Sequence, residues 1–148
     1  MIRSYKITDK PSLIEIFQLN TPEYFYPHEQ KDLEEFLAEH ADTFFVVEIG
    51  NKIVGSGGYH FPENKSAARI SWYMFHPEFR GKGLGRKQVE FSLEEIRKEK
   101  SVKTISVWTS NLAYRFYEKF GFINQEIKKD FWGPGMDLYR MEMGTNQE

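Results

Sequence analysis

The sequence predicts an α+β fold: a mixed, mostly antiparallel central sheet with helices on both faces. Two pairs of β-rich segments, 44–49 with 52–60 and 122–131 with 136–143, are each joined by a glycine-containing turn, which is typical of hairpins. The segment 67–75 is different, because a helical pattern follows it before the next strand begins. Such a crossover is right-handed and joins parallel strands, so the sheet must be mixed.

The N-terminal part of the chain supplies one strand and two helices. Residues 2–7 are rich in β-forming side chains and predict the first strand. The pair Thr8-Asp9 offers a capping side chain for a helix, and Pro11 suits a first turn, where no N–H is required. Apolar residues at helical spacing continue this helix and predict a second one over 29–40.

Two further helices are predicted in the second half. One opens at the glycine-rich segment 80–85 and runs to about Lys100, ahead of a strand at 104–109. The other covers 111–120. The predicted element order is β-α-α-β-β-β-α-β-α-β-β, in a single domain over residues 1–148.

Composition excludes several classes of protein. The 148 residues are 40% hydrophobic with a formal charge of −2, which is too apolar and too near neutral for a disordered chain and lacks the basic excess of a nucleic-acid-binding protein. No cysteine is present, so disulfides and thiolate nucleophiles are excluded. The N-terminus resembles no signal peptide, and no apolar run approaches the ~20 residues of a membrane span. We therefore expect a cytoplasmic protein without nucleic-acid or membrane partners.

The segment Arg80-Gly-Lys-Gly-Leu-Gly-Arg86 has the features of a pyrophosphate site. Its glycines let the backbone approach a ligand, and the helix that follows contributes about half a positive charge at its N-terminus. The spacing fits neither a P-loop nor a dinucleotide fingerprint. Two alternatives stay open: a plain surface turn with solvated cations, and a nucleotide-binding domain that uses the same loop.

Two motifs resemble one known family. Arg80-x-x-Gly83-x-Gly85, after a strand that ends in His-Pro, resembles the acyl-CoA-binding motif of the GCN5-related N-acetyltransferase (GNAT) family. Residues 113–122, Ala-Tyr-Arg-Phe-Tyr-Glu-Lys-Phe-Gly-Phe, resemble its second motif, A-x-x-x-Y-x-K-x-G-F. The predicted element order also resembles the family fold over essentially the whole chain.

The resemblance implies acetyl-CoA as the acetyl donor. It implies that backbone amides of the loop bind the pyrophosphate and that Met74 and Phe75, at the end of the preceding strand, lie beside the pantetheine arm. Many members carry an asparagine where this chain has Ser110; Asn111 follows it and is expected to cap the next helix or to contact the cofactor. The implied loop ligands are Arg80, Gly81, Lys82, Gly83, Leu84, Gly85 and Arg86.

Tyr117 matches the family's general-acid tyrosine. A phenol with a pKa near 10 can protonate a departing thiolate whose parent thiol has a pKa of about 8.5 or somewhat higher. The alternative is a core tyrosine that packs its helix against the sheet.

The general base stays open. Many members carry a glutamate early in the strand before the loop, whereas this chain has Arg69, Ile70 and Ser71 there. His60, Glu48 or water are the candidates. The four histidines show no metal-site spacing, so no metal is predicted.

The resemblance thus predicts an N-acetyltransferase that moves an acetyl group to a primary amine by direct attack in a ternary complex. The acceptor would be a small-molecule or peptide amine. For the aromatic segment 24–26 and for Phe131 and Trp132 two interpretations stay open: they form the acceptor pocket, or they cover the core at loop crossings. The sequence determines neither which amine is the acceptor nor whether the acyl group is only acetyl. The alternative function is a non-catalytic CoA-binding sensor or regulatory module. A homodimer through the edge of the closing hairpin is a further expectation.

Overall fold

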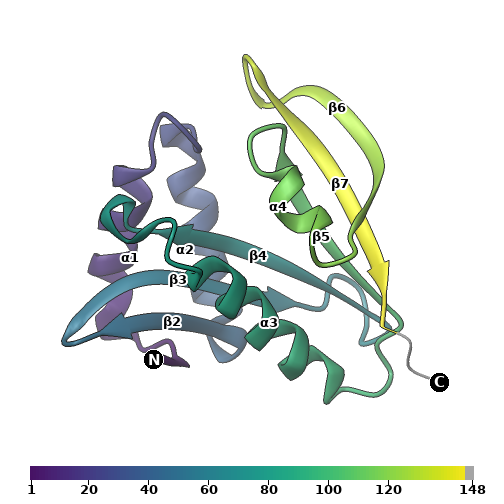
Figure 1. Cartoon of the computed structure of the whole chain (residues 1–148), viewed down its shortest axis with the longest axis horizontal. Helices are drawn as coiled ribbons and strands as arrows, with labels where there is room; N and C mark the ends of the chain where they lie inside the picture. Colours follow the sequence, from purple (N-terminus) through teal and green to yellow (C-terminus); the bar gives the residue numbers. More distant parts are fainter. Residues whose placement is uncertain (146–148) are drawn as a thin grey trace. The chain divides into compact units, whose positions relative to one another are not determined.

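The computed structural model describes residues 1–145 and has the predicted α+β fold (Figure 1). All predicted strands and helices are present in the predicted order. The strands are β1 (Ile2–Ser4), β2 (Phe44–Ile49), β3 (Lys52–His60), β4 (Ala67–Phe75), β5 (Thr104–Ser110), β6 (Ile123–Gly133) and β7 (Met136–Gly144). The helices are α1 (Lys10–Leu19), α2 (Gln30–Glu39), α3 (Leu84–Arg97) and α4 (Tyr114–Glu118), and short 3-10 turns span Ile7–Asp9, Pro27–Glu29, Ala41–Thr43 and Pro77–Phe79.

The strands form a mixed sheet with the order β1-β2-β3-β4-β5-β7-β6. Both predicted hairpins are antiparallel, as is the pair of β5 with β7. The crossover through α3 makes β4 and β5 parallel, and their register pairs Ala67–Ile70 with Thr104–Val107. This confirms the mixed sheet that the strand–helix–strand pattern predicts.

The chain divides into two compact units. The first consists of Met1–Tyr59 and Trp72–Glu94, and the second of His60–Ser71 and the chain from Glu95 onward. Each unit is described by itself. The single domain expected from the sequence stays a prediction.

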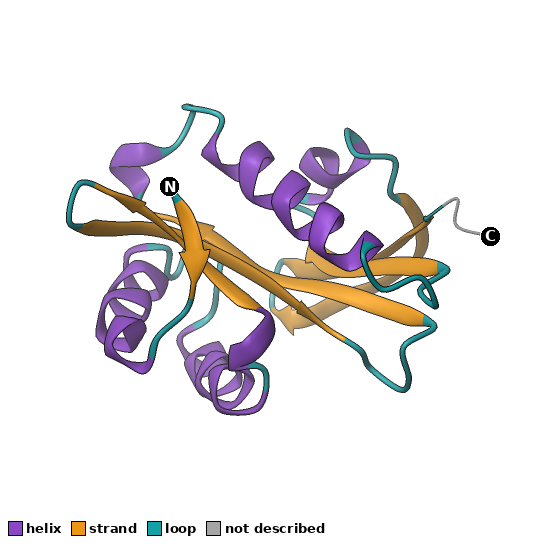
Figure 2. Ribbon diagram, turned by 90° about the horizontal axis from the view of Figure 1, so that it is seen from below, coloured by secondary structure: helices purple, strands orange, loops and turns teal. Residues whose placement is uncertain are grey.

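In the first unit, helices lie on both faces of the strands. Figure 2 shows α1 and α2 on one face and α3 on the other. Apolar side chains of α1 and α2 meet β2 and β4 in one core, whose largest fully buried members include Leu13, Phe17 and Phe44. The helical spacing seen in the sequence therefore reflects burial of one face of each helix.

A buried glutamine joins α3 to the other face of the strands. The Gln88 side chain is fully buried, and its Nε2 donates to the backbone oxygens of Phe45, at 3.3 Å, and Gly57, at 3.1 Å. A buried amide must find such partners, because an unsatisfied one costs free energy. This contact sets the position of the helix that follows the glycine loop.

The start of α1 differs from the expectation. Asp9 occupies the N-cap position, but its side chain makes no capping bond to α1. Its carboxylate instead accepts from both Arg3 Nη atoms, each at 2.9 Å, and from the Lys6 N–H at 2.8 Å. The first strand accordingly ends at Ser4 rather than residue 7, since the chain turns here toward Asp9.

In the second unit, α4 packs on one face of β5 and β7. The Tyr114 ring stacks on Tyr139 of β7 with their centroids 4.2 Å apart. The helix is shorter than the predicted 111–120, and its N-cap is Ala113 rather than Asn111. Ser110 Oγ accepts from the Leu112 N–H in the preceding turn.

The closing hairpin of the second unit ends the sheet. β6 stands last in the strand order, and its residues from Ile123 to Asp130 are exposed. Among the described residues, β6 therefore forms the exposed sheet edge expected from the sequence. Dimerisation through this edge stays a prediction.

Candidate functional site

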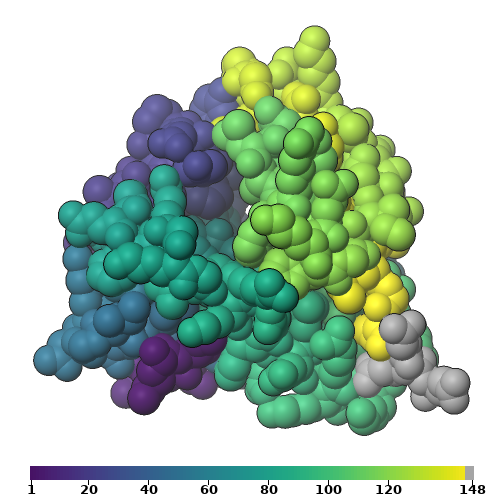
Figure 3. Space-filling view, in the orientation of Figure 1, coloured from purple at the N-terminus to yellow at the C-terminus, as the bar shows by residue number. Residues whose placement is uncertain are grey.

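The glycine loop of the first unit has a backbone that only glycine adopts without strain. Gly81 and Gly83 have φ angles of +76° and +78°, in the left-handed region. A Cβ atom at either position would meet no protein atom within 4 Å, so neither glycine is required for packing. The surface beside both residues is therefore open to a ligand, and the teal segment that contains them lies on the face shown in Figure 3.

Helix α3 begins at Leu84, so the last three residues of the segment Arg80–Arg86 form its first turn. Its first intrahelical bond runs from the Lys87 N–H to the Gly83 carbonyl at 3.2 Å. The N–H groups of the preceding turn, including those of Leu84, Gly85 and Arg86, lack intrahelical acceptors, as at every helix start. Backbone donors and the helix dipole together suit a phosphate group.

Cationic side chains surround the loop. Lys82 and Lys52 both lie near the Phe79 ring, with Nζ 5.1 Å and 5.7 Å from its centroid. Arg86 is exposed and forms an ion pair with Glu90 at 2.7 Å. Lys52, on the β2–β3 hairpin, was not predicted as part of this site, because it lies about 30 residues away in the sequence.

Arg80 does not extend into solvent as a simple loop cation. Its guanidinium lies over the Tyr24 ring at 4.7 Å, and one Nη donates to Asn20 Oδ1. Its other Nη lies 4.0 Å from a Glu23 carboxylate oxygen. The predicted cofactor ligand thus also holds the loop between α1 and α2.

Asn20 is a site residue that sequence reasoning missed. It is buried, and its Nδ2 donates to the Ile16 carbonyl at 2.7 Å and to the Phe75 carbonyl at 3.1 Å. With Arg80 on its oxygen, Asn20 joins α1, the end of β4 and the glycine loop. In the sequence Asn20 only continues the helical spacing of the first helix, which does not indicate these contacts.

His76 caps the turn that leads into the glycine loop. Its Nδ1 accepts from the Glu78 N–H at 3.1 Å and caps the 3-10 turn Pro77–Phe79. An Nδ1 acceptor requires the proton of the neutral imidazole to lie on Nε2.

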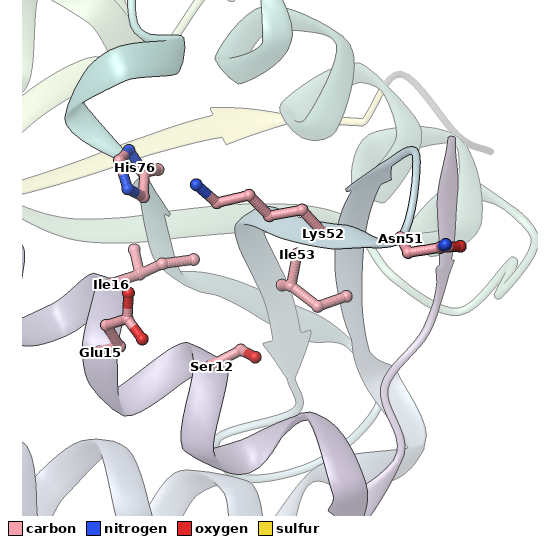
Figure 4. A pocket seen from close by; sticks show the side chains of 7 residues that line it. All are labelled: Ser12, Glu15, Ile16, Asn51, Lys52, Ile53 and His76. Atoms are coloured by element: carbon pink, nitrogen blue, oxygen red, sulfur yellow. The ribbon is translucent and has the colours of Figure 1, made fainter.

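A small hollow of about 200 Å³ lies beside this histidine in the first unit (Figure 4). Helix α1 contributes Glu15, and the start of β3 contributes Lys52, whose ammonium group points toward His76 (Figure 4). The other lining residues are Ser12, Ile16, Asn51 and Ile53. The hollow is polar and mixed in charge, so it indicates no single ligand.

The two strand residues predicted beside the cofactor have different surroundings. The Met74 side chain is buried in the core of the first unit. The Phe75 ring lies against Gly55 of β3, where an added Cβ would stand 2.3 Å from its Cδ1. Any contact of Met74 with a cofactor must therefore involve its backbone.

A distortion in β4 precedes these residues. Trp72 has a φ of +63°, which is uncommon for a residue other than glycine. Ser56 Oγ donates to its carbonyl at 3.0 Å, and its ring packs against Phe17 and Phe25. Such irregular strand positions often lie next to active sites.

Tyr117 lies in the second unit, on α4. Its side chain is buried, in edge contact with the Phe116 and Phe122 rings at centroid distances of 5.1 Å and 6.0 Å. Burial raises the pKa of the Tyr117 phenol well above its usual value. The phenol therefore keeps its proton throughout the neutral range.

Asn111 also lies in the second unit, but its side chain does not cap a helix. Its Oδ1 accepts from the Asp137 N–H at 2.9 Å and so holds the start of β7. The expected capping role is wrong, because α4 starts three residues later, at Tyr114. A contact of Asn111 with the cofactor stays a prediction.

Arg69 and Trp108 form a second feature that sequence reasoning missed. The half-buried guanidinium of Arg69 lies 4.2 Å from the Trp108 ring centroid, and its Nε is 3.4 Å from Ser106 Oγ. The sequence showed only that Arg69 stands where many members of the family carry a carboxylate. The stacking depends on the parallel register of β4 and β5, which no sequence pattern specifies.

The two base candidates lie in different units. Glu48, in the first unit, forms an ion pair with Arg3 at 3.2 Å, which gives it a structural role. His60 is the first residue of the second unit and is half-buried. The general base stays open.

The described residues hold no group of three or more His, Asp or Glu side chains suited to a metal ion. Within the same residues, no helix is both long and apolar enough to cross a membrane.

Comparison with known proteins gives a consistent family match. Residues 13–122, which include the glycine loop and Tyr117, match the model of the acetyltransferase (GNAT) family. An N-alpha-acetyltransferase from Saccharolobus solfataricus is 26% identical over 153 residues, covering 95% of this chain and 90% of the relative.

Two further similarities extend the comparison. A cysteine-rich protein 2-binding protein from Mus musculus is 33% identical over 124 residues, which are 83% of this chain but only 15% of that protein. The chain thus spans a small part of that relative's length. The structure of yncA from Salmonella typhimurium with its cofactor acetyl-CoA matches with a TM-score of 0.78 at 19% identity, covering 100% of this chain and 95% of that one.

Proposed function

Because the chain belongs to the acetyltransferase (GNAT) family, we propose that it transfers an acetyl group from acetyl-CoA to a primary amine. The observation that carries the proposal is the glycine loop before α3. Its two left-handed glycines, open surface and helix N-terminus supply donors for a pyrophosphate. The yncA structure with acetyl-CoA supports the choice of ligand.

The proposed cofactor site consists of the loop from Arg80 to Arg86 and the end of β4. The loop amides bind the pyrophosphate, and Lys82 adds positive charge. Phe75 and the backbone of Met74 lie beside the pantetheine arm, whose amides suit pairing with an extended strand. Asn111 is proposed as a further cofactor contact.

The proposed reaction is direct attack in a ternary complex. The amine nitrogen attacks the thioester carbonyl carbon, the C–S bond breaks, and CoA leaves as a thiolate. Tyr117 donates its phenolic proton to that thiolate, and the amine loses its proton to a base or to water. Without a cysteine in the chain, no cysteine acyl-enzyme can form.

The burial of Tyr117 has two consequences for this role. It raises the pKa of the phenol and so keeps it protonated, and therefore able to donate, throughout the neutral range. The same desolvation disfavours the phenolate left after donation, so the transfer requires a thiolate that is also poorly solvated and correspondingly basic. Reprotonation of Tyr117 from solvent then completes the cycle.

A peptide α-amine is the first acceptor to test. The relative from Saccharolobus solfataricus that covers nearly the whole chain is named an N-alpha-acetyltransferase. A small-molecule amine is the other proposed class.

A thiol-release assay tests the proposal directly. The chain contains no cysteine, so a thiol reagent reports only the CoA released from acetyl-CoA. We expect amine-dependent CoA release and N-acetylated product by mass spectrometry. Tyr117→Phe is expected to lower kcat by about 10²- to 10⁴-fold, the usual contribution of a general acid, with little change in CoA affinity.

Tyr114→Phe is the matched control, because it removes one hydroxyl from the same helix while the ring can still stack on Tyr139. Its activity should stay within about twofold of the parent. CoA binding without transfer to any amine would favour the sensor alternative. Binding of ATP or NAD in preference to CoA would contradict the cofactor assignment itself.

A further inference from the structure

We propose that Arg69, stacked on Trp108, binds a carboxylate carried by the amine acceptor and so selects acidic acceptors. This inference rests on the proposed acetyltransferase function and names the substrate class for it. The residues that carry it all belong to the second unit.

The position of the pair in the sheet comes from the strand register. Arg69 of β4 pairs with Ser106 of β5. The parallel pairing of these strands ends at the next residue pair, Ile70 with Val107. Trp108 is the next residue of β5. The guanidinium therefore stacks on Trp108 at the point where the parallel pairing ends. Trp108 pairs with Arg140, and neighbouring residues of a strand face opposite sides of the sheet. The stacked pair therefore lies on the face opposite to that of Tyr139.

Arg69 is held in place but is not neutralised. Within residues 1–145, no carboxylate forms an ion pair with it, and its recorded side-chain hydrogen bond is to the neutral hydroxyl of Ser106. Burial and the nearby Arg140 both lower the pKa of the Arg69 guanidinium, as expected for a cation that lacks an anionic partner.

Arg140, on the same face, provides the contrast. Its Nε lies 3.2 Å from Glu126 and its Nη1 lies 2.9 Å from Glu142. Glu126 and Glu142 are therefore both engaged by Arg140. The N–H donors of the planar Arg69 guanidinium are therefore oriented by Trp108 and available to a ligand.

The chemistry of the pair points to a carboxylate. A guanidinium binds a carboxylate through two parallel N–H···O bonds, and stacking on an indole fixes its plane. Phe131 stands edge-on to Trp108 with centroids 6.1 Å apart, which adds an apolar wall for the carbon chain of an acceptor. The sequence also predicts Phe131 as a candidate contact of the acceptor.

Matched acceptor pairs test the proposal and separate two sources of the carboxylate. One pair is alanine and alaninamide, which differ in the α-carboxylate. The other is the peptide amides Ser-Glu-Ala and Ser-Gln-Ala, which differ in a side-chain carboxylate. In at least one pair, kcat/KM should be tenfold or more higher for the acidic member, and in Arg69→Gln this ratio should fall to about one.

Three controls define the result. Lys128→Gln removes a cation that lies near Phe131 and should keep the acidic preference within about twofold. Arg69→Lys retains the positive charge but loses the two parallel N–H donors of the guanidinium, so it should retain only part of the preference for acidic acceptors. An unchanged CoA affinity in Arg69→Gln shows that the fold is intact, whereas a higher KM for acetyl-CoA would assign Arg69 to the cofactor and overturn the proposal.

Binding gives a readout that does not depend on catalysis. Tryptophan fluorescence of the CoA-saturated protein, titrated with the same acceptors, should report Arg69-dependent binding of the acidic members, with Trp108→Phe as the control for the signal. Equal binding and equal transfer of acidic and neutral acceptors would overturn the inference while the acetyltransferase function stands. Arg69-dependent binding without any transfer would instead contradict the proposed function.

Discussion

Asp9 shows at the scale of one residue how a charged side chain can organise the start of the chain. It is 6% exposed, and Arg3 donates two hydrogen bonds to its carboxylate while Lys6 donates a third from the backbone. The Arg3 guanidinium holds the pKa of the Asp9 carboxyl below its usual value. The folded state therefore binds a proton at Asp9 less readily than the unfolded chain does.

Asp9→Asn is expected to lower the free energy of unfolding by about 1–3 kcal/mol at pH 7, as for a lost charged hydrogen bond. Because the pKa of Asp9 is lowered by folding, its contribution is full above the unfolded value of about 4 and is lost as pH falls through the folded value. Urea unfolding of parent and variant should thus differ at neutral pH and converge in acid.

Glu34→Gln is the control for this experiment. Glu34 forms an ion pair with Lys10 at 3.3 Å, but both side chains are more than a third exposed, so its loss should cost less than about 0.5 kcal/mol. A difference between parent and Asp9→Asn that persisted in acid would contradict the electrostatic explanation.

The sequence indicated some residues of the site and gave no signal for others. Tyr117 and the loop glycines stand in sequence motifs, because the conformation of a loop and the position of a side chain on a short helix are local properties. Asn20 and Arg69 carry no such signal. Their partners, Arg80 and Trp108, lie 60 and 39 residues away and are brought near only by the sheet.

At the scale of elements, the loop before α3 allows the stability cost of backbone strain to be measured apart from the loss of ligand affinity. Gly83 has a φ of +78° and Gly50, in the β2–β3 turn, has +63°, and an added Cβ meets no atom within 4 Å at either. Substitution by alanine should cost about 1–2 kcal/mol of stability at each, the usual cost of a left-handed L-residue. The two glycines thus form a matched pair.

Gly83→Ala should in addition weaken CoA binding by tenfold or more, because the methyl group occupies the open surface proposed for the pyrophosphate. Gly50→Ala should leave CoA affinity within about twofold. Isothermal titration with CoA, beside urea unfolding of both variants, measures the two effects separately. Equal CoA affinity in both variants would contradict the placement of the cofactor on this loop.

Whole elements were predicted better than their ends. Both hairpins and the crossover follow from turn residues and from apolar spacing, which act over a few neighbours. The capping side chains expected at the starts of α1 and α4 bind other partners instead. Asp9 binds Arg3 rather than capping α1, and Asn111 binds the Asp137 N–H rather than capping α4.

At the scale of the whole molecule, a ligand that binds only the folded protein must stabilise it. A ligand at 100 times its dissociation constant adds about 2.7 kcal/mol, which corresponds to roughly 8 °C in Tm for a chain of this length. Acetyl-CoA and CoA should each give such a shift, whereas ATP and NAD at the same concentration should not.

Thermal unfolding measured with each ligand in turn checks this expectation. Gly83→Ala provides the control. Its Tm without ligand should fall by the few degrees that correspond to about 1–2 kcal/mol, and its Tm shift with CoA should be smaller than that of the parent because its CoA affinity is lower. An equal shift with ATP would return the loop to the nucleotide-binding alternative.

The sequence by itself determined the element order, the mixed sheet, the glycine loop and the family to which the chain belongs. These properties depend on residues close together in the chain: turn formers, periodic apolar side chains and two short motifs. Only the tertiary structure decided that Arg80 is held by Asn20, that Met74 is buried in the core and that Arg69 stacks on Trp108. Those contacts join residues far apart in the chain, and the register of the strands, which no local pattern specifies, brings them together.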